Sequence, residues 1–239
     1  MINVSKVLDE AIEKDVRDQA EARLKKSVSV SILSADFLEL KNELDKIEKS
    51  NADMLHFDVM DGVFVPNISF GFPVLDTVNK YTDMHLDVHL MITDPLKYID
   101  ECVKFGADTI TIHLESESDT EKALDKIKKS GVKAGLSVKP GTPFEDAIPF
   151  MDKIDMLLIM TVEPGFGGQS FMEDMLDKIA AAKKYISENN LDVAIEVDGG
   201  INNKTGKLVS EAGADILVAG SYIFKHSDMN EAVSSLACL

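Results

Sequence analysis

The chain has 239 residues, of which 45% are hydrophobic, and its formal net charge at pH 7 is −17. Nucleic acids and anionic membranes attract basic surfaces, so this acidic balance argues against both as partners. No apolar run approaches the ~18 residues of a membrane span. Two cysteines are too few for a disulfide scaffold, which predicts reduced thiols and a cytoplasmic protein.

Residues 1–26 form the first predicted element. Basic and acidic residues are equally frequent there, and apolar residues recur at four-residue spacing: Leu8, Ile12, Val16, Ala20 and Leu24. This spacing predicts an amphipathic helix. We interpret the segment as an N-terminal helical extension that docks on the main domain or on a partner subunit and takes no part in the chemistry. Residues 27–239 then form one enzyme domain.

From residue 28 onward, short β-rich apolar runs alternate with stretches of helical periodicity. The predicted strands are 28–33, 54–59, 85–91, 109–114, 133–138, 155–160, 193–198 and 215–220. The predicted helices include 38–49, 95–105, 119–130, 171–189 and 202–212. Repeated strand–helix units build parallel sheets. Because there are eight units and no Gly-x-Gly-x-x-Gly follows the first strand, we predict an α/β protein with a single (β/α)8 TIM barrel rather than a doubly wound sheet.

Polar side chains gather at the carboxyl ends of the predicted strands. They are Ser31, His56, Asp58, His89, His113, Thr161, Asp198 and Ser221. In a barrel of this kind these ends converge on one mouth, where active sites are built. His85 shares a strand face with His89 but lies toward the closed bottom, so we expect it to be structural. For His113, support of the site and simple packing both stay open.

Four of these side chains form a candidate metal site. His56 and Asp58 are two residues apart in a strand and therefore point to the same side, while His89 and Asp198 end the third and seventh strands. One histidine or aspartate at a strand end is more often structural, but four at one mouth favour metal binding. Two imidazoles and two carboxylates suit Zn²⁺, Fe²⁺, Mn²⁺ or Co²⁺ and not a metal that prefers thiolates.

Glycine clusters follow the last three predicted strands. They comprise Gly165, Phe166, Gly167 and Gly168, then Gly199 and Gly200, then Gly220 with Ser221. Glycine lets backbone N–H groups come close to an anion, and the loops after the late strands commonly bind phosphate in such barrels. One glycine pair would be read as a turn, but three clusters predict a phosphate site that needs no lysines.

Seven segments closely resemble the ribulose-phosphate 3-epimerase family. They are SILSADF (31–37), LHFDVMDGVFVPNISFG (55–71), LDVHLMI (86–92), KPGTP (139–143), MTVEPGFGGQSF (160–171), IEVDGGIN (195–202) and VAGSYIF (218–224). The resemblance runs from about residue 27 to the C-terminus. It departs at Val30, where the family often has proline, and this departure concerns local backbone shape rather than chemistry.

Position by position, the resemblance implies the roles of individual residues. One divalent cation per subunit, with Zn²⁺ favoured, is implied to bind His56, Asp58, His89 and Asp198, and Asp58 and Asp198 are implied to be the catalytic acid–base pair. The implied substrate-binding residues are Ser31, His89, Gly165, Phe166, Gly167, Gly168, Asp198, Gly199, Gly200, Gly220 and Ser221. An apolar lid is implied for Met60, Met91 and Met160, although methionine at such positions is most often core filling.

The implied reaction interconverts D-ribulose 5-phosphate and D-xylulose 5-phosphate, a step of the pentose phosphate pathway. A proton leaves C3, a 2,3-enediolate forms, and a proton returns to the opposite face, so one carboxylate is needed on each face. A metal ion stabilises the enediolate as a Lewis acid. The expected partner is a small ketose phosphate, and the resemblance also implies a homo-oligomer, either a dimer or a hexamer.

Three alternatives remain. A D-allulose-6-phosphate 3-epimerase would share the fold, the metal and the mechanism, although SILSADF, GFGGQ and VDGGIN are of the pentose-phosphate type. A decarboxylase of the related superfamily would carry Asp-x-Lys-x-x-Asp in the third strand, where LDVHLM stands. A non-catalytic sugar-phosphate-binding barrel would have lost a ligand or a carboxylate, and none is missing.

Overall fold

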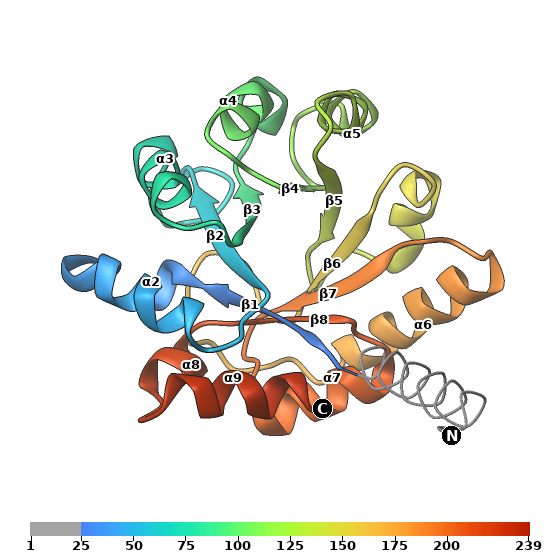
Figure 1. Ribbon diagram of the computed structural model, residues 1–239. Coiled ribbons are helices and arrows are strands. Elements are labelled where there is room, and N and C mark those ends of the chain that lie inside the picture. Colours follow the sequence, from blue (N-terminus) through green and yellow to red (C-terminus); the bar gives the residue numbers. More distant parts are fainter. Residues whose placement is uncertain (1–24) are drawn as a thin grey trace, which may run out of the picture.

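The computed structural model describes residues 25–239 (Figure 1), so the helix expected in residues 1–26 lies almost wholly outside the described part. Eight parallel strands close into a barrel in the order β1 to β8, with helices arranged around the outside. The predicted (β/α)8 barrel is therefore confirmed. Within residues 25–239, no helix combines the length and the hydrophobicity that crossing a membrane requires.

The observed strands begin and end within two residues of the predicted ones. They are β1 (Ser27–Ser31), β2 (Met54–Met60), β3 (His85–Met91), β4 (Thr109–His113), β5 (Lys133–Val138), β6 (Met156–Met160), β7 (Ala194–Asp198) and β8 (Ile216–Ala219). The helices are α2 (Leu40–Glu48), α3 (Phe72–Tyr81), α4 (Ile99–Lys104), α5 (Thr120–Lys129), α6 (Met175–Glu188), α7 (Asn203–Ala212), α8 (Ser221–Lys225) and α9 (Met229–Ala237). Short 3₁₀ helices are η1 (Ile32–Ser34), η2 (Phe37–Glu39), η3 (Pro95–Lys97) and η4 (Phe144–Phe150).

Two helical regions differ from the prediction. Helix α6 begins at Met175, later than expected, because the backbone N–H of Met172 donates to the carbonyl of Thr161 and keeps residues 171–174 out of the helix. The segment after β5 forms only the 3₁₀ helix η4, which contains Pro149. Proline has no backbone N–H to donate, so a regular α-helix is disfavoured there.

Alternate residues of each strand face opposite sides of the barrel wall, as the pleat of a strand requires. In β2, Leu55, Phe57 and Val59 pack into the large apolar core between the strands and the surrounding helices. The intervening residues fill the barrel interior, and across the strands many of them are polar and buried: Ser29, Ser31, His56, Asp58, Asp87, His89, Thr111, His113, Ser137 and Glu196. Burying polar groups costs free energy unless they are paired, so the interior is specialised for something other than stability.

At the closed end of the barrel, one aspartate stands immediately before each even-numbered strand. Each carboxylate accepts the backbone N–H of the second residue of the preceding odd-numbered strand, at 2.8–3.0 Å. The pairs are Asp53 with Val28, Asp108 with Leu86, Asp155 with Ala134, and Asp215 with Ile195. The chain enters this end at Lys26, whose backbone N–H donates to Ala237 and whose ammonium donates to the carbonyl of Ala214.

Candidate active site

Strand register brings the predicted ligands together at the open end of the barrel. In the β2–β3 pair, Asp58 lies opposite His89 and His56 lies opposite Asp87. Asp198 ends β7, and a ligand atom of each of His56, Asp58, His89 and Asp198 lies within 4.8 Å of the others. The geometry therefore places the four side chains named from sequence around one point.

The separations of these atoms fit a single divalent cation. With metal–ligand bonds of about 2.0–2.1 Å, the ligand atoms of a tetrahedral zinc site lie about 3.3 Å apart. His56 Nε2 is 3.3 Å from Asp58 Oδ1 and 3.3 Å from His89 Nδ1, and His89 Nδ1 is 3.4 Å from Asp58 Oδ1. Asp198 Oδ2 stands 3.9 Å from both imidazole nitrogens. Four donors that converge in this way could hold a Zn²⁺-like ion.

Each histidine of the cluster uses its remote nitrogen for a hydrogen bond. His56 Nδ1 is 2.6 Å from Asp87 Oδ2, which also accepts from the hydroxyl of Ser29 at 3.1 Å. His89 Nε2 is 2.8 Å from His113 Nε2. Such outer partners orient metal-ligating imidazoles and set which nitrogen carries the proton.

The two carboxyl groups of the cluster have pKa values shifted in opposite directions. Burial raises the pKa of Asp58, but the neighbouring His56 and His89 outweigh it and hold that pKa well below its usual value. Burial and the charge of Asp58 raise the pKa of Asp198 to about 6. Burial lowers the pKa of His56, yet Asp87 and Asp58 raise it well above its usual value. The site thus favours positive charge and keeps one carboxyl ionised beside another that binds a proton more readily.

Sequence reasoning missed two acidic residues beneath this cluster. Asp87 and Glu196 are fully buried, and Glu196 Oε1 lies 4.0 Å from His56 Nδ1. Burial and the charge of Asp87 raise the pKa of Glu196 well above its usual value. The sequence spacing could have identified both residues. Asp87 precedes His89 by two residues and Glu196 precedes Asp198 by two, so each shares a strand face with a predicted ligand.

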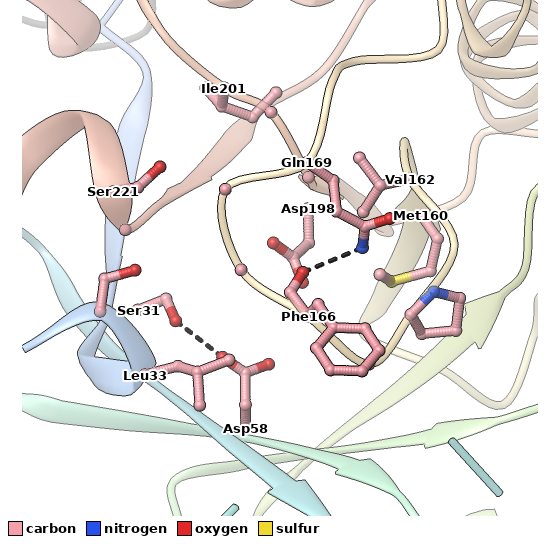
Figure 2. Close-up of a pocket in the computed structure, with 18 of the residues that line it drawn as sticks. Ser31, Leu33, Asp58, Met160, Val162, Phe166, Gln169, Asp198, Ile201 and Ser221 are labelled. Carbon is pink, nitrogen blue, oxygen red and sulfur yellow. Dashed lines mark hydrogen bonds between the residues drawn. The ribbon is translucent and has the colours of Figure 1, made fainter. Parts of the chain in front are cut away.

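A pocket opens above the cluster, and Figure 2 shows Asp58 and Asp198 pointing into it. Its lining includes all the predicted site residues except the two histidines: Ser31, Asp58, Met60, Met91, Met160, Gly165, Phe166, Gly167, Gly168, Asp198, Gly199, Gly200, Gly220 and Ser221. His56 and His89 are fully buried and lie beneath the pocket floor. Leu33, Ser34, Gln169 and Ile201 also line the pocket and were not named from sequence.

Ser31 contributes directly to the position of a carboxylate. Its hydroxyl donates to Asp58 Oδ2 at 2.7 Å, a contact drawn in Figure 2. Asp58 is therefore held by Ser31 on one oxygen, while its other oxygen faces the two histidines. This hydrogen bond was not foreseen from sequence, since it depends on how β1 and β2 pair.

The glycine loops have conformations that other residues disfavour. Gly199 and Gly200 have φ values of 125° and 68°, and a Cβ at these positions would lie 2.4 Å from Val162 and 2.7 Å from the backbone nitrogen of Phe171. The loop before them is closed by Gln169, whose side-chain amide donates to the carbonyls of Glu163 and Phe166. Backbone therefore forms much of the pocket wall on this side.

Comparison with known proteins places this geometry in a family. The model of the "Ribulose-phosphate 3 epimerase family" matches residues 27–224. The chain belongs to this family. It is 47% identical over 210 residues to the ribulose-phosphate 3-epimerase of Bacillus subtilis, covering 87% of this chain and 97% of the relative. It is 43% identical to the cytoplasmic isoform of Oryza sativa, covering 87% and 92%.

Solved structures of lower identity share the fold. A 3-hexulose-6-phosphate synthase covers 89% of this chain and 98% of its own, with a TM-score of 0.64 and 20% identity. KGPDC from Streptococcus mutans covers 89% and 95%, with a TM-score of 0.65 and 13% identity. At these identities the likeness extends to the barrel alone.

Within this epimerase-family site, three methionines form apolar parts of the pocket wall. Met60 and Met91 pack with Val65, and Met160 packs with Leu158 and Val162. All three methionines are at least 95% buried. All three methionines line the pocket together with Phe166, which is 54% exposed.

Two other polar residues named from sequence lie outside the cluster of four. His85 starts β3, and its Nε2 is 2.8 Å from the hydroxyl of Thr109 toward the closed end of the barrel. The hydroxyl of Thr161 donates to the carbonyl of Gly199 and so holds the glycine loop after β7.

Proposed function

We propose that this protein interconverts D-ribulose 5-phosphate and D-xylulose 5-phosphate by moving a proton at C3. Membership of the ribulose-phosphate 3-epimerase family supports this activity, as do relatives of that name at 42–47% identity. The observation that carries the proposal is the pair Asp58 and Asp198, which face one pocket with pKa values shifted apart. Pairs of titratable groups driven apart in this way mark an acid and a base.

The two carboxyl groups divide the proton transfer between them. Asp58, held ionised by His56 and His89 and oriented by Ser31, accepts the C3 proton of D-ribulose 5-phosphate. Asp198 delivers a proton to the opposite face of the planar 2,3-enediolate, which yields D-xylulose 5-phosphate. In the reverse direction the two residues exchange roles.

The residues that we assign to the metal are His56, Asp58, His89 and Asp198. Zn²⁺ is favoured, because two imidazole nitrogens and two carboxylate oxygens at these separations suit it, and Fe²⁺, Mn²⁺ and Co²⁺ suit the same donors. When bound, the cation supplies Lewis-acid stabilisation of the negative charge that develops on the sugar oxygens. The two imidazoles orient the site and take no proton from the substrate.

We assign the phosphate to the loops after β6, β7 and β8. Glycines line this side of the pocket, so backbone N–H groups can approach an anion on a protein whose net charge is −17. The apolar side chains of Met60, Met91 and Met160 exclude water from the reacting carbons, and we retain for them the role of an apolar cover. Excluding water strengthens the electrostatic stabilisation of the enediolate.

Two wider features belong to the same proposal. Leu38 in η2 is 94% exposed, and Val63 and Ile68 in the loop after β2 are 78% and 75% exposed; these exposed apolar side chains support a homo-oligomer. Both cysteines, Cys102 and Cys238, are free, which fits the reducing conditions of the cytoplasm. Light scattering on the purified full chain tests the oligomer.

A direct assay tests the activity and its dependence on metal. Purified protein is stripped with a strong chelator, checked by elemental analysis, and supplied with ribulose 5-phosphate or allulose 6-phosphate. We expect turnover of ribulose 5-phosphate to disappear on stripping and to return with Zn²⁺, Fe²⁺, Mn²⁺ or Co²⁺. Full activity of metal-free protein would disprove the metal site, and faster turnover of allulose 6-phosphate would reassign the substrate.

A further inference from the structure

We propose that His113, anchored by Glu115, fixes the tautomer and ring orientation of His89, so that His89 turns Nδ1 toward the metal ligands. His113 and Glu115 are then positioning residues for the proposed function, on which this inference rests. The inference also assigns a role to the KPGTP segment after β5. The proposed epimerase mechanism alone gives this segment no function.

The proton positions follow from three contacts. His113 Nδ1 is 3.2 Å from Glu115 Oε2, and an ionised carboxylate only accepts, so Nδ1 of His113 carries the hydrogen. In a neutral imidazole the other nitrogen is then an acceptor, and His113 Nε2 lies 2.8 Å from His89 Nε2. The hydrogen between them therefore belongs to His89 Nε2. This leaves His89 Nδ1 with a free lone pair, facing His56 Nε2 and Asp58 Oδ1 at 3.3 and 3.4 Å.

Glu115 is itself held by the turn that follows β5. Its Oε1 accepts the backbone N–H of Lys139 at 2.7 Å and the hydroxyl of Thr142, which leaves Oε2 for His113. Burial alone would raise the pKa of Glu115, but the hydrogen bonds from His113, Thr142 and Lys139 hold it at about 2. The chain of contacts therefore runs from residues 139–142, through Glu115 and His113, to His89.

Aromatic packing keeps water away from this chain of contacts. The rings of His89 and His113 stack with centroids 5.0 Å apart, and Phe64 covers His113 with centroids 4.9 Å apart. The ammonium of Lys139 lies 3.7 Å from the centre of the Phe64 ring. Both histidines are fully buried, so water has no ready access to replace a lost partner of His89.

The two ligating histidines are thus supported differently. His56 is held directly by the carboxylate of Asp87 at 2.6 Å, whereas His89 is held by a neutral imidazole that a carboxylate orients in turn. Removing the acceptor at His113 leaves the Nε2–H of His89 without a partner and free to change tautomer. A proton on Nδ1 would then compete directly with the metal for the same lone pair.

Zinc affinity and histidine NMR together test the proposal. The dissociation constant of Zn²⁺ is measured by chelator competition on the full-length protein, first for the native chain and then for variants. We expect His113→Leu to weaken zinc binding by about 10–100-fold, the usual effect of losing an outer partner of a metal ligand. His113→Gln should recover most of the affinity, because its Oε1 can stand where Nε2 stood and accept from His89. Glu115→Gln should show a smaller loss.

His85 offers a matched control on the same strand face, four residues before His89. His85→Leu removes a partly buried histidine that bonds Thr109 at the other end of the barrel. Its zinc dissociation constant should equal that of the native protein. Equal losses in His85→Leu and His113→Leu would show a general effect of removing an interior histidine and would overturn the proposal.

Long-range ¹H–¹⁵N spectra of the native protein provide a readout that needs no variant to fold. We expect His113 to carry its hydrogen on Nδ1 and zinc to perturb Nδ1 of His89. The opposite tautomer of His113, or native zinc affinity in His113→Leu, would overturn this inference and leave the proposed function standing. Native protein that takes up no zinc would overturn both.

Discussion

The two ends of this barrel use the same amino acid for opposite purposes. At the closed end, Asp53, Asp108, Asp155 and Asp215 each accept a backbone N–H, and two of them also pair with lysines. At the open end, Asp58 and Asp198 converge on each other and on two histidines. One arrangement spreads carboxylates over separate donors, and the other concentrates them around one point.

The difference shows where this fold gains stability and where it gives stability up. A carboxylate with its own hydrogen-bond donor stabilises the folded state, whereas neighbouring buried carboxyls repel one another and raise a pKa, as at Asp198. Interior oxygens without a hydrogen-bond partner in the described part of the chain include Oδ1 of Asp87, the hydroxyls of Thr111 and Ser137, and both carboxyl oxygens of Glu196. Sites that break the usual rules of burial are where function is expected.

The largest expected effect is loss of epimerisation on changing a carboxylate of the open end. Asp58→Asn or Asp198→Asn should lower kcat by about 10²–10⁴-fold, since each removes one acid–base group. In heavy water, metal-loaded Asp198→Asn should still incorporate solvent deuterium into one epimer without converting it. Asp58→Asn should do the same for the other epimer.

Metal content must be measured in both variants, because both residues belong to the proposed ligand set. The free energy of unfolding of metal-free Asp198→Asn should stay the same or rise, since the change relieves repulsion between carboxyls. That of metal-free Asp58→Asn should fall, since the change removes a carboxylate that His56, His89 and Ser31 stabilise. If metal-loaded Asp198→Asn still epimerises at a near-native rate, Asp198 is not a catalytic acid–base group, and in this respect it does not differ from the aspartates of the closed end.

The second prediction concerns acid stability. Burial lowers the pKa of His113 to about 4, from the ordinary 6.5. Between pH 6.5 and pH 4 the His113 imidazole is protonated in the unfolded chain but not in the folded chain. The free energy of unfolding therefore falls as the pH is lowered through this range. The loss due to this group is on the order of 3 kcal/mol.

Urea unfolding of metal-free protein at several pH values measures this loss. His113→Gln cannot titrate, so its free energy of unfolding should fall less steeply with acid than that of the native protein. Parallel curves for the two proteins from pH 7 to pH 4 would show that protonation of His113 is not what destabilises the protein in acid.

The third prediction concerns the closed end. Asp108→Ala removes the acceptor of the Leu86 backbone N–H and should lower the free energy of unfolding by about 1–3 kcal/mol. The kcat of the folded variant should remain native, because Asp108 lies at the opposite end from the pocket. Denaturant titration and the epimerase assay on one preparation check both parts. Loss of kcat without loss of stability would contradict the view that the closed end serves stability and the open end serves catalysis.

The smallest expected effect concerns the lysines of the closed end. Lys128 and Asp155 form an ion pair at 3.2 Å, with side chains 44% and 36% exposed. Solvent screens such pairs, so Lys128→Met should change the free energy of unfolding by less than about 1 kcal/mol. A larger loss would mean that Asp155 stabilises the fold mainly through its ion pair with Lys128 and not through its hydrogen bond with the backbone N–H of Ala134.

The amino-acid sequence by itself determined the barrel and the four candidate metal ligands. Short β-rich apolar runs separated by stretches of helical periodicity mark the strands, and eight strand–helix units allow a closed parallel barrel. Residues near the carboxyl ends of the strands must then meet at one mouth, which is why His56, Asp58, His89 and Asp198 could be grouped without coordinates. Glycines after the last three strands could be placed beside them for the same reason.

Only the tertiary structure decided how these groups are supported. The hydrogen bonds of Ser31 to Asp58, Asp87 to His56 and His113 to His89 each cross between neighbouring strands. Their existence depends on strand register and on side-chain rotation, neither of which periodicity encodes. The turn at residues 139–142 reaches His89 only through two intermediate side chains, so its link to the site follows from packing and not from spacing along the chain.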